Sequence, residues 1–202
     1  MQKNITAKTY DSITAEKLCK SFGEKNVLKD LSFSVPYGSV AVIKGASGTG
    51  KTTALRILAG LTQQDSGTVL GVEGKTVAFL FQEDRLLPWL TALQNVEAVI
   101  TDKAKKHIAR DILTELALGD EKDLTSYPSE LSGGMQRRVA IARALAYEAD
   151  VIILDEALRG LDAANVENTV KVIRKYTVGK TVISVTHHLS EIEEKADIII
   201  EL

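Results

Sequence analysis

The chain has 202 residues, of which 45% are hydrophobic, and this suits one globular domain with a sizeable core. A formal net charge of −2 gives no overall basic surface for nucleic acid, and the single cysteine, Cys19, cannot form an internal disulfide, which fits a reducing compartment. Residues 1–11 lack the apolar segment of a secretory signal, and no apolar run reaches the ~20 residues of a membrane-spanning helix. We therefore expect other chains to supply the span if the protein works at a membrane.

The first predicted element is a piece of antiparallel β-structure. Residues 12–35 contain two stretches with alternating character, "ITAEKLCKSF" and "VLKDLSFSV", and "GEKN" between them favours a turn. Residues 1–11 are expected to be a tail or an extra edge segment.

A glycine-rich loop follows the first buried strand. The apolar run at 40–45 predicts that strand, residues 50–59 predict a helix, and "GASGTGKT" between them fits G-x-x-x-x-G-K-[ST] in the context that makes this motif specific. Glycines let successive backbone N–H groups point at phosphate oxygens, and the helix N-terminus presents its positive end to the same anion. We expect Lys51 to reach the β- and γ-phosphates and the Thr52 hydroxyl to bind Mg²⁺. The alternative is an ordinary glycine-rich turn between a strand and a helix.

The middle of the chain is helical in pattern. Residues 77–81, "VAFLF", predict a second buried strand, but 91–146 contain no convincing strand and predict a helical insertion. Within it, "LSGGMQRR" precedes a helix predicted over 135–147. Two adjacent glycines make an ordered backbone less favourable, so their presence needs an explanation. The two candidates are the close approach of a ligand and a tight helix start between packed helices.

An acidic pair lies at the end of the third buried strand, "VIILD" at 151–155. Charges at the carboxyl end of a strand lie where ligands bind in open α/β sheets. We expect Asp155 to hold Mg²⁺ through water, and Glu156 to act as general base on the attacking water or to orient it. The alternative is an acid pair that caps a helix.

The remaining elements complete an alternation of strands and helices. Residues 163–176 place Val166, Val170 and Ile173 on one helix face, and the runs 181–186 and 197–202 predict two more buried strands.

These elements predict an α/β fold: a P-loop NTPase core with a mainly parallel sheet, an N-terminal antiparallel β subdomain and an inserted helical subdomain. We interpret 12–202 as a single domain, with a core of 12–90 and 147–202 and a helical subdomain of 91–146.

Four motifs carry a family resemblance. "GASGTGKT", "LSGGMQRRVAIARAL", "VIILDE" and "VTHH", in that order, resemble the ATPase subunits of ATP-binding cassette (ABC) transporters, from about Ser12 to Leu202. In that family two cassettes pair head to tail with ATP between the P-loop of one and the "LSGG" signature of the other. The resemblance implies that the signature residues Ser132, Gly133, Gly134 and Gln136 meet ATP held by the opposite chain.

The resemblance also implies the nucleotide-binding residues of the chain itself. They are the P-loop residues with the threonine after them, and an aromatic side chain that stacks on adenine: Gly45, Ala46, Ser47, Gly48, Thr49, Gly50, Lys51, Thr52, Thr53 and Phe22. The alternative for Phe22 is a core position in the β subdomain.

Three further roles depend on the resemblance. Gln82 matches the glutamine that senses Mg²⁺ and water, His187 the switch histidine at the γ-phosphate, and Asp162 the D-loop aspartate. The chain departs from the family at Ala157, where proline usually follows the catalytic glutamate; without proline the backbone there is freer, because proline fixes φ.

After Gln82, "EDRLLPWLTALQNV" is similar to importer cassettes of the nitrate, sulfonate and taurine type. Its apolar cluster, Leu86 to Trp89, would mark a protein interface if exposed, and in the family this region faces the permease. The alternative is a loop that folds its tryptophan onto the helical subdomain.

The resemblance implies an ATP-hydrolysing subunit, dependent on ATP and Mg²⁺, that works as a homodimer at the cytoplasmic face of the membrane. It would dock on a separate transmembrane permease and power import of a small solute delivered by a solute-binding protein, with no nucleic-acid partner. The alternatives are a soluble cassette ATPase acting on nucleic acid or ribosomes, a cassette of a non-importing transporter, and a scaffold with a degenerate site.

Overall fold

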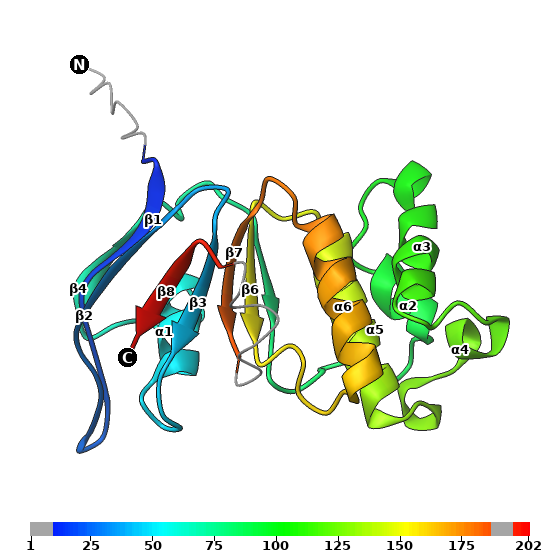
Figure 1. Cartoon of the computed structure of the whole chain (residues 1–202), viewed down its shortest axis with the longest axis horizontal. Helices are drawn as coiled ribbons and strands as arrows, with labels where there is room; N and C mark the ends of the chain where they lie inside the picture. The colour runs from blue at the N-terminus through cyan, green and yellow to red at the C-terminus, as the bar shows by residue number, and fades with distance from the viewer. Residues whose placement is uncertain (1–9, 187–195) are drawn as a thin grey trace.

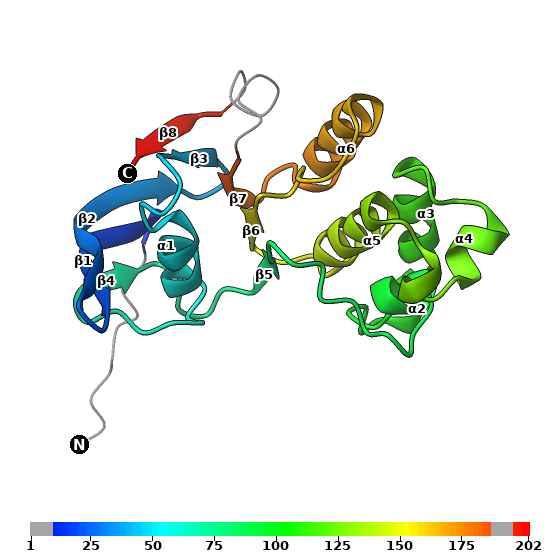
Figure 2. The same ribbon diagram turned by 90° about the horizontal axis from the view of Figure 1, so that it is seen from below.

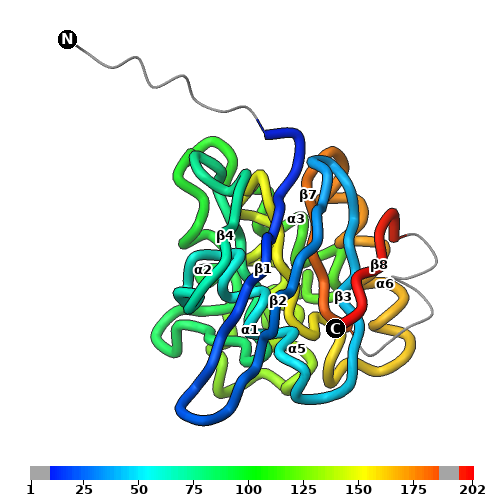
Figure 3. The backbone as a smooth tube through the Cα atoms, turned by 90° about the vertical axis from the view of Figure 1, so that its left-hand side faces the viewer, coloured from blue at the N-terminus to red at the C-terminus, as the bar shows by residue number. Residues whose placement is uncertain are grey.

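The computed structural model describes residues 10–186 and 196–202. Strands β1 (Ser12–Phe22) and β2 (Lys25–Pro36) form the expected antiparallel hairpin, onto which Figure 3 looks. Its turn is shorter than "GEKN", because Lys25 already pairs with Phe22. Strand β4 (Ser66–Leu70) pairs antiparallel with the other edge of β1 and gives the order β2-β1-β4. The sequence analysis did not predict β4.

The second sheet is parallel and holds all five predicted apolar strands in the order β5-β6-β7-β3-β8. Their bounds are β3 (Val40–Lys44), β5 (Val77–Leu80), β6 (Val151–Asp155), β7 (Thr181–Val185) and β8 (Ile198–Glu201). Because the strands are parallel, the loops after β3, β5 and β6 leave from the same edge of the sheet.

One prediction about this sheet is wrong. The run at 197–202 was expected to be buried on both faces, but Ile199 is 48% exposed. The reason is position: in the described residues β8 pairs only with β3 and forms an edge of the sheet. By contrast, every residue of β6 and β7 is buried.

Helices lie on both faces of the parallel sheet, and one of these faces points toward the antiparallel sheet (Figure 1). Helix α1 (Lys51–Leu58) packs between the sheets, whereas the long helices α5 (Gly133–Ala146) and α6 (Ala163–Tyr176) lie on the opposite side of the parallel sheet. The predicted helical stretch contains α2 (Ala92–Glu97), α3 (His107–Glu115), α4 (Glu121–Thr125) and the 3₁₀ turns Lys103–Lys105 and Pro128–Glu130. Figure 2 shows these helices at the far end of the molecule from the antiparallel sheet.

Two hydrophobic cores result, one on each face of the parallel sheet. Ile153 and Leu55 belong to the core shared with α1 and the antiparallel sheet, and Ile152 and Ile141 belong to the core under the helices. Neighbouring residues of β6 enter opposite cores because successive side chains of a strand point to opposite faces. Among the helices of the described ranges, none is long and apolar enough to cross a membrane.

Candidate functional site

The glycine-rich loop connects β3 to α1, and two of its glycines are required by the local structure. Gly50, the residue before α1, has φ 99°, and a Cβ there would lie 2.7 Å from Leu28 Cδ2 and 2.9 Å from the Val27 carbonyl oxygen. Gly45 has φ 152°, and its Cβ would lie 2.6 Å from the Leu202 carbonyl oxygen. No side chain caps α1, so its positive N-terminal end is left to a ligand.

The loop lysine is buried against its own loop. Lys51 is 7% exposed, and its Nζ donates hydrogen bonds of 2.8 Å to the carbonyl oxygens of Gly45 and Ala46. Two neutral acceptors only partly compensate a buried ammonium group, so the position suits an anionic ligand.

The first acid of the predicted pair lies beside the loop. Asp155 is 1% exposed, Thr52 Oγ1 donates to its Oδ1 at 3.1 Å, and its Oδ2 has no hydrogen-bond partner in the described part of the chain. Burial raises the pKa of the Asp155 carboxyl, and the nearby Glu156 adds to the rise, against the hydrogen bond from Thr52.

A buried carboxylate oxygen without a partner, next to a hydroxyl, fits a hard divalent cation that takes oxygen ligands. The described residues contain no cluster of three acidic, histidine or cysteine side chains that could hold a metal alone. A cation here would therefore share its coordination with oxygens of a bound ligand, as Mg²⁺ does in sites that bind nucleotide phosphates.

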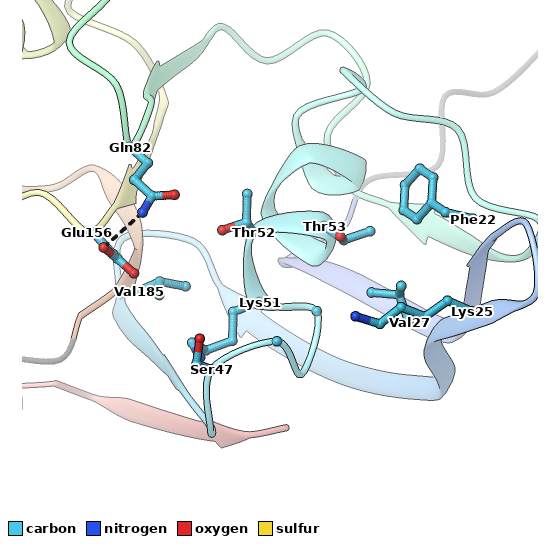
Figure 4. Close-up of a pocket in the computed structure, with 12 residues that line it drawn as sticks. Phe22, Lys25, Val27, Ser47, Lys51, Thr52, Thr53, Gln82, Glu156 and Val185 are labelled. Atoms are coloured by element: carbon cyan, nitrogen blue, oxygen red, sulfur yellow. Dashed lines mark hydrogen bonds between the residues drawn. The ribbon is translucent and has the colours of Figure 1, made fainter.

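The second acid faces the glutamine from the neighbouring strand. Gln82, two residues beyond β5, donates from Nε2 to Glu156 Oε2 at 3.3 Å (Figure 4). Glu156 has φ 51°, a left-handed conformation uncommon outside glycine, and its carboxylate also lies 3.6 Å from Arg159 Nη1. The two residues thus form a polar pair at the carboxyl edge of the sheet.

Lys51, Thr52, Gln82 and Glu156 line one pocket of about 420 Å³, and Asp155 lies buried behind Thr52. In Figure 4 the Gln82–Glu156 pair lies at one end, Lys51 and Thr52 lie in the middle, and Phe22 lies at the other end. Phe22 is 54% exposed, so the alternative that it belongs to the β-subdomain core is wrong. Of the predicted nucleotide residues, the pocket is lined by Phe22, Ser47, Gly48, Gly50, Lys51, Thr52 and Thr53.

Three lining residues were missed by the sequence analysis: Lys25, Val27 and Val185. Lys25 and Val27 come from β2, and only the packing of that strand against Gly50 brings them near the loop. Val185 ends β7, which lies between β3 and β6. Because the strands are parallel, the sequence could have predicted that the end of β7 lies near the loops after β3 and β6.

The predicted signature residues do not line this pocket. Ser132 caps α5, because its Oγ accepts a hydrogen bond from Met135 N at 3.3 Å. A Cβ on Gly133 would meet nothing within 4 Å, and one on Gly134 would lie 3.6 Å from the Gly160 carbonyl oxygen. In the described residues, the alternative of a tight helix start between packed helices therefore does not explain the glycine at position 133.

Two further predicted residues make local contacts. Gln136 Nε2 donates to the carbonyl oxygens of Pro128 and Leu131 at 2.9 and 3.1 Å, so its amide nitrogen holds the turn before α5. Asp162 caps α6 by accepting from Asn165 N at 3.0 Å, and hydrogen bonds from the Asn165 side chain and backbone lower the pKa of its carboxyl. The predicted switch residue His187 lies outside the described residues.

The segment after Gln82 exposes Pro88 and Trp89 and is firmly held, whereas Leu86 is partly buried and packs against the core under the helices. Trp89 is 68% exposed, so the alternative that it folds onto the helical subdomain is wrong. The fully buried Asn95 anchors the segment: its Oδ1 accepts from Leu87 N at 2.8 Å, and its Nδ2 donates to the carbonyl oxygens of Leu87, Leu90 and Thr91. The apolar surface is therefore presented by an ordered loop.

The loop between β3 and α1, at the carboxyl edge of a parallel sheet, defines a P-loop nucleotide-binding protein. The profile of the family "ABC transporter" matches residues 28–159. The aliphatic sulfonates import ATP-binding protein SsuB of Zymomonas mobilis is 40% identical over 95% of this chain and 82% of its own length. The putative hemin import ATP-binding protein HrtA of Staphylococcus epidermidis is 36% identical over 94% of this chain and 96% of its own.

Solved structures give the same result. An ATP-binding cassette, solved as a dimer in a post-hydrolysis state bound to ADP and Pi, superposes with a TM-score of 0.83 at 30% identity over 94% of both chains. The chain belongs to the ABC transporter family, and as a cassette of that family it is an ATPase that binds ATP.

Proposed function

We propose that this chain is the Mg²⁺-dependent ATPase subunit of an ABC importer, working as a homodimer with two ATP sites at the dimer interface. The observation that carries the proposal is the order of groups along one pocket, from an exposed aromatic ring through a phosphate-binding loop to an acid–amide pair. That order matches the base, the phosphates and the attacking water of a bound ATP.

The protein groups divide the binding of ATP between them. The Phe22 ring stacks on adenine, and the N–H groups of the loop with the start of α1 surround the phosphates. Lys51 exchanges its two carbonyl acceptors for the β- and γ-phosphates, so that its charge is paired only when the nucleotide is bound.

Thr52, Asp155 and Gln82 would hold Mg²⁺, which neutralises charge on the β- and γ-phosphates when it is bound. The partnerless Oδ2 of Asp155 supports this assignment. Ligand oxygens complete the coordination, since the described side chains alone do not form a full metal cluster.

Glu156 acts on the water that attacks the γ-phosphate. It accepts the proton of that water or orients it, and Gln82 holds the carboxylate by its Nε2 hydrogen bond. Lys51 stabilises the negative charge spread over the transferred phosphoryl group. His187 would contact the γ-phosphate, and Asp162 would lie at the dimer interface.

The signature of the partner chain completes each site. Ser132, Gly133 and Gly134, with Gln136 behind them, would approach the γ-phosphate held by the opposite chain, and the open space around Gly133 supports this role. The related cassette solved as a dimer bound to ADP and Pi is consistent with such pairing. Within the single domain 12–202, the helical subdomain 91–146 carries the signature to the partner.

The exposed loop around Trp89 docks on a transmembrane permease, so the chain is peripheral at the cytoplasmic face of the membrane. We further propose that the transported solute is a small anion of the sulfonate, taurine or nitrate type, delivered by a solute-binding protein and never touched by this chain. The SsuB relatives support the sulfonate class, and HrtA makes hemin the competing solute.

Phosphate release from MgATP by the purified chain tests the enzymatic part. We expect Glu156→Gln to abolish turnover and to accumulate an ATP-bound dimer in size-exclusion chromatography with light scattering. The exposed Glu73→Gln is the matched control and should hydrolyse ATP as wild type does. Turnover by Glu156→Gln at the wild-type rate would refute the catalytic role of Glu156. A monomer at saturating MgATP would refute the dimer with ATP at its interface.

Affinity purification from gently solubilised membranes tests the transport part. We expect mass spectrometry to find a multi-helix permease and its solute-binding protein. Uptake assays with these partners would then identify the class of solute. Recovery of ribosomal or DNA-repair proteins alone would refute the transport function while leaving the ATPase intact.

A further inference from the structure

One buried arginine, for which the proposed function has no role, joins the two loops of the catalytic pair. Arg137 lies on α5, three residues after Gly134, and is 3% exposed. Its guanidinium has five N–H donors, and they meet six acceptors on two separate segments. A fully used guanidinium in a buried position restrains its acceptors, since moving either segment away leaves buried donors unpaired.

The first set of acceptors follows β6. Arg137 Nη2 donates to the carbonyl oxygens of Asp155 at 3.0 Å and Glu156 at 2.8 Å, and Nε donates to that of Ala157 at 2.9 Å. Three consecutive carbonyl oxygens thus converge on one side chain. Regular strand or helix geometry does not bring consecutive carbonyls together in this way, and the left-handed φ of 51° at Glu156 accompanies the convergence.

That backbone conformation requires support from its surroundings. A non-glycine residue in the left-handed region is strained and persists only where neighbouring structure over-determines it. Ala157 has no ring that fixes φ, so the restraint on the turn must come from contacts. The three hydrogen bonds from Arg137 supply part of it, together with the backbone hydrogen bonds from Glu156 N to the Val185 carbonyl oxygen and from Arg159 N to the Glu156 carbonyl oxygen.

The second set of acceptors follows β5. Arg137 Nη1 donates to the carbonyl oxygens of Phe81 at 2.7 Å and Gln82 at 3.4 Å, and it pairs with Asp84 Oδ1 at 3.1 Å. The same guanidinium therefore holds the backbone of Gln82 on one side and that of Glu156 on the other. Both partners of the 3.3 Å contact between Gln82 and Glu156 are thus held through their backbones by Arg137.

We propose that Arg137 is a positioning residue, which sets the catalytic geometry of Glu156 and Gln82 from the helix that carries the signature. The inference rests on the proposed function, because it assigns Glu156 its role in hydrolysis. It has a mechanical corollary: the signature at the start of α5 and the catalytic pair behave as one rigid unit joined through Arg137, and Arg143 of the same helix also holds the loop after β5 by donating to the carbonyl oxygens of Asp84 and Arg85.

The test uses Arg137→Lys in the full chain. A lysine keeps the charge but presents one nitrogen, which cannot bridge both loops as the planar guanidinium does. We expect kcat for ATP hydrolysis to fall at least 10-fold, while the Kd for MgATP stays within about threefold of wild type, because a positioned base contributes roughly 10²–10⁴-fold to rate and little to binding.

The matched control is Asn168→Ala on α6. Asn168 is half-buried and donates from Nδ2 to the Glu115 carbonyl oxygen at 2.7 Å, and neither residue lines the pocket. It should lose stability and keep its kcat. Equal loss of kcat in both variants would reduce Arg137 to a general packing role and overturn the proposal.

A second variant covers the case in which Arg137→Lys does not fold. Asp84→Asn removes the charged partner of Arg137 from a partly exposed position, and it should lower kcat without changing the Kd for MgATP. Wild-type kcat in a folded Arg137→Lys, or in Asp84→Asn if the first variant is insoluble, would overturn the proposal.

A crystal structure of whichever of these two variants folds separates this inference from the proposed function. We expect Glu156 to leave the left-handed region, or its contact with Gln82 to be lost; retention of both would overturn the proposal. A wild-type chain without ATPase activity would refute the proposed function instead, and the structural result would still decide whether Arg137 positions the pair.

Discussion

Replacing Asp155 by asparagine should have opposite effects on stability without and with nucleotide. In the protein without ligand the carboxylate is buried, and its Oδ2 has no partner in the described residues. The folded-state pKa is raised, so the folded chain binds more protons than the unfolded chain, and its stability falls as pH rises from the unfolded value of 3.8 through the raised pKa. The penalty is present once the pH exceeds the raised pKa, and Asp155→Asn removes it.

The magnitudes are large enough to measure. A buried polar group without a partner costs about 1–3 kcal/mol, and a charged one more than a neutral amide, so we expect the variant to gain about 1 kcal/mol, or about 2–4 °C in Tm, in EDTA. Wild type with MgATP at a hundred times its Kd gains about 2.7 kcal/mol, or about 5–11 °C. The variant should lose most of this second gain, so the order of the two melting temperatures reverses.

Differential scanning calorimetry at pH 7, in EDTA and in saturating MgATP, provides the measurement. Asp150→Asn is the control of opposite sign, since hydrogen bonds from the Thr76 backbone and side chain lower the pKa of Asp150. Its contribution is present above its unfolded pKa and lost as pH falls through the folded value, so the control should destabilise at pH 7. An Asp155→Asn chain that melts lower than wild type in EDTA, or keeps the full MgATP shift, refutes the reasoning.

Three further substitutions test the Trp89 loop, the phosphate-binding loop and the signature. Asn95→Ala strips four hydrogen bonds from the Trp89 loop and should cost about 1–3 kcal/mol in urea unfolding; an unchanged midpoint contradicts the anchor. Gly50→Ala should weaken binding of a fluorescent ATP analogue at least 10-fold, because its Cβ overlaps Leu28; wild-type affinity would show that the loop adapts. Gly133→Val should leave the unfolding midpoint of the monomer nearly unchanged yet prevent the ATP-dependent dimer in light scattering; a normal dimer excludes a close approach there.

Sequence patterns were sufficient where the information is local. The strand–loop–helix unit around Lys51, the acidic pair after β6 and the helix over α6 all lie where their patterns predicted. The family assignment and the P-loop fold are confirmed by the comparisons. The roles of individual site residues stay predictions, including that of His187.

The missed features depend on contacts between distant segments. Strand β4, "SGTVL", is short and mostly exposed, and only its pairing with β1 makes it a strand. Arginine side chains usually lie on the surface of a helix, so no pattern around Arg137 predicts that it is buried. Its acceptors are backbone carbonyl oxygens, which every residue carries and no pattern of side chains reveals.

The position of β3 inside its sheet has a consequence for biosynthesis. β3 carries the phosphate-binding loop at its end, and its two neighbours, β7 and β8, follow every other strand of the described residues in the sequence. A ribosome therefore releases the loop long before the strands that hold it in place have been made. Such long-range pairing folds slowly, and the emerging chain leaves both edges of β3 open to other strands. ATP binding thus waits until β7 and β8 have been made, which makes nucleotide affinity a readout of their pairing with β3.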